Sequence, residues 1–223
     1  MDKIALKVFS FLMILALILP IFTPTADAAT NKIRYSTILK SASGKPFNVS
    51  LMGMKERTAK ASFDGKYGFD FVWEGANEGD LLYNGNYELF VKNKATNFLI
   101  KNYTYNKTRK MVYKIPARFK GQPDLLLIAE AGSSNFEGSN VYYMYNGKLK
   151  KAKSEIGYTL RPQNIAKNTF KVASYNNADI EVGYYITTFK LNPKTGKISK
   201  VKTEKVKGSN NLTVAKKWKK HWE

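Results

Sequence analysis

The chain lacks cysteine and has a single histidine, and both absences exclude kinds of chemistry. Without cysteine there is no disulfide, no thiolate zinc site and no cysteine nucleophile. One histidine, His221, cannot build a multi-histidine metal centre and gives no basis for a Ser-His-Asp triad. We therefore expect neither a metal nor a cofactor. Acidic residues are also scarce, because 17 Asp and Glu stand against 37 Lys and Arg, a net charge of +20. Such a surface attracts polyanions before any specific contact forms.

Long apolar runs are absent after residue 28, and the single long run lies before it. Ile4–Phe22 is apolar almost throughout, follows two lysines and leads to Ala26-Asp27-Ala28, a small-x-small cleavage pattern. Pro20 and Pro24 argue against an uncleaved spanning helix, because proline interrupts a helix before it reaches the ~20 apolar residues that a bilayer needs. We expect residues 1–28 to be a signal peptide, and the mature chain to be secreted without a transmembrane segment.

Helical periodicity is scarce as well, and short runs of aromatic and β-branched residues with period-2 alternation dominate residues 29–207. This pattern predicts an all-β domain of short antiparallel strands separated by Asn-Gly, Gly-Lys and Asn-Pro turns. The candidate strands are Lys32–Leu39, Phe47–Met54, Tyr67–Trp73, Tyr87–Lys92, Asn97–Tyr105, Lys110–Ile115, Asp124–Ala129, Val141–Tyr145, Thr169–Tyr175, Tyr184–Leu191 and Ile198–Val206.

Three hairpins have the same order of strand, polar turn and strand. One turns through Asn146-Gly147, a pair that favours a type I′ turn because both central residues need positive φ. A second turns through Asn192–Gly196, and a third joins Tyr87–Val91 to Asn97–Tyr103. Their spacing indicates an internal repeat of roughly 40 to 55 residues.

The segments Asn84–Val91, Lys120–Ile128 and Asn176–Gly183 each place an acidic residue between a polar turn and an apolar strand. This order resembles the FG-GAP or VCBS-type repeat of integrin-like β-propellers. The resemblance implies three or four propeller-like repeats, with residues 30–75 as a candidate fourth repeat turning at Phe63–Tyr67. An irregular β-sandwich remains the alternative.

In that family the turn often holds calcium through several oxygen ligands. Here Asn84 and Asn86 are neutral, basic residues precede Asp124, and the third turn alone keeps two acids, Asp179 and Glu181. Calcium sites need high negative charge, so we expect these acids to accept hydrogen bonds from nearby backbone amides instead.

Glu74, Glu78 and Asp80 form a glycine-containing acidic loop beside Trp73. Acids next to an aromatic platform are typical of a glycosidase subsite. The loop therefore supports an alternative, an extracellular carbohydrate-active enzyme, although acids and glycines between strands are also typical of a solvated connection.

The C-terminal segment is strongly basic, with a net charge of +8 from Lys194 to Glu223. Residues 208–223 are expected to form a short amphipathic helix or tail. In one interpretation its tryptophans dock on the β-domain, and in the other its lysines and indoles bind an anionic polymer or membrane headgroups. The candidate polyanion-binding residues are Lys216, Lys217, Lys219, Lys220, Trp218 and Trp222.

Together these features favour a secreted, non-enzymatic binding or structural protein. Its expected partners are anionic cell-envelope polymers or acidic lipid surfaces, which would place it at the cell wall. A nucleic-acid partner fits the charge but not the export, so none is expected. The sequence does not indicate an oligomeric state.

Overall fold

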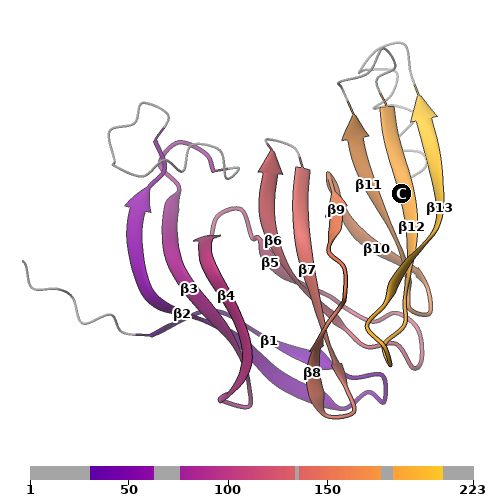
Figure 1. Cartoon of the computed structure of the whole chain (residues 1–223), viewed down its shortest axis with the longest axis horizontal. Coiled ribbons are helices and arrows are strands. Elements are labelled where there is room, and N and C mark those ends of the chain that lie inside the picture. Colours follow the sequence, from indigo (N-terminus) through magenta and orange to yellow (C-terminus); the bar gives the residue numbers. More distant parts are fainter. Residues whose placement is uncertain (1–30, 63–75, 134–135, 177–182, 208–223) are drawn as a thin grey trace, which may run out of the picture. The chain divides into compact units, whose positions relative to one another are not determined.

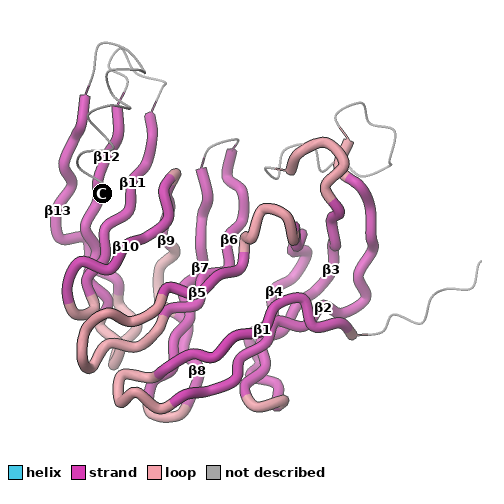
Figure 2. The backbone as a smooth tube through the Cα atoms, turned by 180° about the vertical axis from the view of Figure 1, so that it is seen from behind, coloured by secondary structure: helices cyan, strands magenta, loops and turns pink. Residues whose placement is uncertain are grey.

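The computed structural model describes residues 31–62, 76–133, 136–176 and 183–207, all within one unit of the chain. Their regular elements are thirteen β-strands (Figures 1 and 2). The strands are β1 (Lys32–Lys40), β2 (Pro46–Lys60), β3 (Leu81–Val91), β4 (Lys94–Asn106), β5 (Val112–Ile115), β6 (Leu125–Ser133), β7 (Phe136–Tyr145), β8 (Lys148–Lys151), β9 (Ile156–Tyr158), β10 (Leu160–Ala166), β11 (Thr169–Asn176), β12 (Gly183–Leu191) and β13 (Ile198–Lys207).

The strands form three antiparallel sheets, in each of which four consecutive strands are hydrogen-bonded neighbours. The first sheet has the order β1-β2-β3-β4, the second β5-β6-β7-β8 and the third β10-β11-β12-β13. The short strand β9 also pairs with β7. The predicted all-β class is therefore confirmed, with three meander sheets in the described part of the chain.

The three hairpins singled out in the sequence occupy equivalent places. They are β3–β4, β7–β8 and β12–β13, the third and fourth strands of the first, second and third sheets. The central residues of the predicted type I′ turn, Asn146 and Gly147, have φ values of 48° and 75°, as that turn requires.

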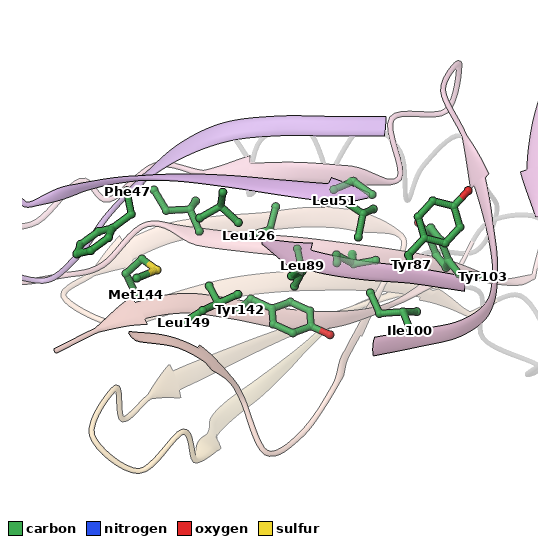
Figure 3. Close-up of a cluster of buried hydrophobic side chains, with 14 of the residues drawn as sticks. Phe47, Leu51, Tyr87, Leu89, Ile100, Tyr103, Leu126, Tyr142, Met144 and Leu149 are labelled. Atoms are coloured by element: carbon green, nitrogen blue, oxygen red, sulfur yellow. The ribbon is translucent and has the colours of Figure 1, made fainter. Parts of the chain in front are cut away.

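The middle sheet is buried on both faces. Side chains alternate between the faces of a strand, and those of Leu126 and Ile128 pack against the first sheet (Figure 3). The side chains of Leu125 and Leu127 pack in a second cluster, with Phe170 of the third sheet. The uninterrupted apolar run Leu125–Ala129 follows from this position, because a strand covered on both sides needs apolar residues at every position.

One predicted turn is wrong, since Asn84-Gly85-Asn86 lies inside β3 rather than before it. The Asn84 side chain donates to Thr104 Oγ1, so the polar residues bond across the sheet. A Cβ on Gly85 would lie 3.0 Å from the Met54 carbonyl oxygen, and the glycine therefore serves close packing rather than a turn.

Strands β9 and β10 were not predicted, because polar residues and Pro162 interrupt the alternation there. The expected strand Tyr67–Trp73, the signal peptide and the C-terminal helix lie outside the described residues.

Candidate functional site

In each of the three meander sheets the first and third connections lie at the same end. Four of these six connections, at the bottom of Figure 1, are the β1–β2, β3–β4, β7–β8 and β12–β13 turns. The other two are the β5–β6 connection, which carries Arg118, Lys120 and Asp124, and the β10–β11 turn. We call the segments 41–47, 91–97, 145–150 and 192–197 the hairpin-tip surface. These segments contain seven lysines and no aspartate, glutamate or arginine. The lysines are Lys45, Lys92, Lys94, Lys148, Lys150, Lys194 and Lys197.

Specific contacts hold neighbouring tips together. Lys150 Nζ donates to the Lys194 carbonyl oxygen at 3.1 Å, which joins the β7–β8 and β12–β13 tips. Lys92 N donates to Asn48 O at 3.0 Å, which fastens the β3–β4 tip to β2. Within the β12–β13 loop, Asn192 Oδ1 accepts hydrogen bonds from the backbone amides of residues 194 and 195. The lysines are therefore carried by turns whose backbone is already fixed.

A groove of about 440 Å³ lies between the β3–β4 and β7–β8 tips. Its volume is within the range of ~300–1,000 Å³ usual for small-molecule sites. The groove combines apolar side chains with lysines and has no acidic lining residue. The lining residues are Phe47, Val91, Lys92, Lys94, Ala95, Thr96, Gly147, Lys148 and Leu149.

Phe47 anchors this groove, and we name it the Phe47 groove. The ring is buried and belongs to the core between the first and middle sheets, toward the same end as Met144 and Leu149 (Figure 3). Lys45 Nζ and Lys92 Nζ lie 5.9 and 5.6 Å from the centre of the ring. Two ammonium groups thus lie within ~6 Å of the centre of one aromatic ring, the range in which the ring attracts a cation.

Lys92 occupies a backbone conformation that lysine rarely adopts. The β3–β4 tip has positive φ at both central residues, 51° at Lys92 and 61° at Asn93. Asparagine tolerates this region, whereas for other non-glycine residues it costs about 1–2 kcal/mol. Lys55 and Lys110, which do not line the groove, have the same φ of 51°.

The acidic loop of the alternative enzymatic interpretation is only partly described. Asp80 is buried, and its Oδ2 accepts hydrogen bonds of 2.9 Å from Asn77 N and Asn106 Nδ2. Glu78 is exposed, and Glu74 lies outside the described residues. The geometry gives the Asp80 carboxylate a structural role in closing the loop before β3.

Two acids expected to bind backbone amides do so. Asp124 Oδ1 accepts from Ala117 N at 2.7 Å, and its Oδ2 accepts from Lys40 N at 2.9 Å. Glu88 Oε1 accepts from Asn97 N at 3.1 Å. The third pair, Asp179 and Glu181, lies outside the described residues. The described residues contain no group of three or more His, Cys, Asp or Glu suited to a metal ion.

Two buried polar clusters lie away from the hairpin tips. Arg34 Nη2 donates to Glu56 Oε2 at 2.6 Å, and the Arg34 guanidinium lies 3.5 Å from the Tyr83 ring centre. In the second cluster Tyr158 hydrogen-bonds both Tyr113 and Ser139. Burial raises the pKa of Tyr158 to about 12. The lining of the Phe47 groove contains no residue of either cluster.

The predicted polyanion-binding residues of the C-terminal segment lie outside the described residues. They are Lys216, Lys217, Lys219, Lys220, Trp218 and Trp222. Lys194 and Lys197, from the same basic segment, belong to the hairpin-tip surface. The Phe47 groove was missed because its residues come from three separate hairpins. The available signal was the repeated pairing of lysine with Asn or Gly in the turns Lys92-Asn93-Lys94 and Asn146-Gly147-Lys148.

Comparison with protein-family models, curated proteins and solved structures gives no match for this chain. Within the described ranges, the structure has no helix with the length and apolar character needed to cross a membrane.

Proposed function

We propose that this protein is a secreted, non-enzymatic binding protein that associates with anionic cell-envelope polymers through its hairpin-tip surface. One observation carries the proposal: seven lysines, without an acidic residue in the same segments, gather at one end of three stacked sheets. Lysine is a point charge that attracts a polyanion without fixing its geometry. A surface of this kind suits a repetitive polymer better than a single shaped substrate.

The secondary structure supports binding rather than catalysis at this end. The tips present ammonium groups on fixed turns, whereas Asp80 of the alternative catalytic loop is buried before β3, where it bonds to Asn77 and Asn106. The resemblance to FG-GAP or VCBS-type repeats stays a prediction, and the meander order of the three sheets is compatible with it.

The test is co-sedimentation of residues 29–223 with purified cell wall at rising salt. Screening shortens the reach of charge from about 10 Å at 0.1 M salt to about 3 Å at 1 M, so binding should fall steeply. A variant with Lys92, Lys94 and Lys148 changed to Gln should bind less than a matched variant with Lys32, Lys101 and Lys190 changed to Gln. Binding that is absent at low salt, or unchanged at 1 M, would contradict the proposal.

A further inference from the structure

The Phe47 groove differs from the other lysines of the hairpin-tip surface because it joins charge to an apolar floor. Lys92, Lys94 and Lys148 stand along it, while Phe47 and Leu149 are buried beneath. Attraction between a basic surface and a polyanion needs no such floor. Its combination with lysines suits a ligand in which a charged group alternates with an uncharged carbon-bearing unit.

The groove favours a polymer over a bilayer surface. Binding to a bilayer requires apolar side chains that enter the headgroup region. The large hydrophobic side chains exposed among the described residues all lie outside the four hairpin-tip segments, and one of them, Phe119, belongs to the β5–β6 connection at the same end. They are Ile33, Ile38, Leu81, Leu99, Phe119, Ile165 and Val201. The tips end instead in Lys, Asn, Gly, Pro and Thr, which stay in water.

The cations of the groove suit phosphate. They are lysines alone, since neither the groove lining nor the four hairpin-tip segments contain arginine, whose planar fork holds carboxylate and phosphate alike. The compact ammonium of lysine binds phosphate oxygens from any direction.

Resting on the proposed function, we propose that the Phe47 groove binds one polyol-phosphate or sugar-phosphate repeat of the anionic polymer. The phosphates contact Lys92, Lys94 and Lys148 along the groove. The uncharged polyol or sugar of the repeat lies over Phe47 and Leu149. The remaining tip lysines attract the rest of the polymer by charge alone.

The probe is a synthetic phosphodiester-linked trimer of glycerol phosphate, titrated against residues 29–223 by calorimetry and by amide chemical shifts. Inorganic polyphosphate of equal charge is the comparison without the polyol. Ala95→Tyr fills the groove without altering charge, and exposed Ala95 lies on β4, where an aromatic residue is well tolerated. Ser199→Tyr, at an exposed position of β13, is the matched control.

The trimer is expected to bind saturably, with shifts centred on the groove and about tenfold more tightly than polyphosphate. Ala95→Tyr should weaken binding of the trimer about tenfold or more, whereas Ser199→Tyr should bind the trimer with wild-type affinity. Changing Lys92, Lys94 and Lys148 to Gln should weaken trimer binding at least about tenfold more than changing Lys150, Lys194 and Lys197 to Gln.

Several outcomes would overturn the inference while the proposed function stands. The first is failure of the trimer to bind, or an equal loss of trimer affinity in the two triple variants, while the whole polymer still binds at low salt. The second is wild-type affinity of Ala95→Tyr for the trimer. Tighter binding to vesicles of acidic phospholipid than to the trimer would also overturn it, in favour of a lipid headgroup. Failure of the whole polymer to bind at low salt would remove the proposed function itself.

Discussion

Arg34 and Glu56 form a part-buried ion pair in which three hydrogen bonds join the guanidinium to the carboxylate. The side chains are 15% and 6% exposed. Tyr87 Oη also donates to Glu56, at 2.5 Å, so the carboxylate is fully engaged. A Cβ on Gly53 would lie 2.0 Å from Glu56 Oε1, which explains why glycine occupies that position of β2. The cluster is therefore a structural feature of the first sheet.

Arg34→Met should lower the free energy of unfolding by about 3–5 kcal/mol, because it leaves the Glu56 carboxylate buried without its cation. Denaturant titration followed by circular dichroism measures the loss. The double change Arg34→Met with Glu56→Met should recover most of it, since an apolar pair of similar volume removes the uncompensated charge.

The exposed pair Lys202–Glu204 is the control, with both side chains more than half exposed. Lys202→Met should change the free energy of unfolding by no more than about 1 kcal/mol. Equal losses at the two pairs would contradict the structural role assigned to the Arg34 cluster.

At the scale of elements, β6 decides the arrangement of the sheets. Leu126→Ala removes contacts with the first sheet and Leu127→Ala removes contacts with the third. Each change should lower the free energy of unfolding by about 2–5 kcal/mol, and Leu99→Ala, at an exposed position of β4, by less than about 0.5 kcal/mol. A large loss from only one of the two β6 changes would show that one face of the middle sheet is uncovered.

At the β3–β4 tip, the backbone strain of Lys92 can be tested together with its proposed role in binding the anionic polymer. Lys92→Gly relieves the positive φ of Lys92 and should raise the free energy of unfolding by about 0.5–1 kcal/mol, while the affinity for the anionic polymer falls. Asn93→Gly relieves φ at the neighbouring residue without removing charge, so its affinity should stay at the wild-type value. Thermal unfolding and binding of the same samples test this opposition in sign.

Sequence patterns located the elements whose signal is local. Every residue of Leu125–Ala129 is apolar because both faces of β6 are covered. Asn146 and Gly147 favour a type I′ turn because both residues readily adopt positive φ. Asn84-Gly85-Asn86 was wrongly predicted as a turn because glycine is needed there for close packing against Glu56, a residue distant in sequence. The Phe47 groove could not be predicted for the same reason, since three hairpins must assemble before its lining exists.

At the scale of the whole molecule, buried tyrosines govern stability at high pH. Burial raises the pKa of Tyr142 and of Tyr158 to about 12 each, and also raises the pKa of Tyr87 and Tyr113. A tyrosine in the unfolded chain ionises near pH 10 while its buried counterpart stays protonated. Above pH ~10 the folded state therefore binds more protons, and the free energy of unfolding falls as pH rises.

We expect the tyrosine contribution to the free energy of unfolding to be constant below pH ~9 and to decline between pH ~10 and ~12. Each buried tyrosine contributes a slope of about 1.4 kcal/mol per pH unit in that window. Denaturant titrations at successive pH values, with tyrosinate absorbance as a second signal, measure it. Ionisation of all tyrosines near pH 10 without unfolding would contradict the burial described here.

The central claim, that the hairpin-tip lysines bind an anionic polymer by charge, is tested most directly by the salt dependence of affinity. For polyanions the logarithm of the association constant falls linearly with the logarithm of salt concentration, and each contacting lysine adds about one to the slope. Changing Lys92, Lys94 and Lys148 to Gln should lower the slope for purified cell-wall polymer by about three. The claim would be contradicted if the Lys92, Lys94 and Lys148 variant had the same slope as the wild type and as the Lys32, Lys101 and Lys190 control.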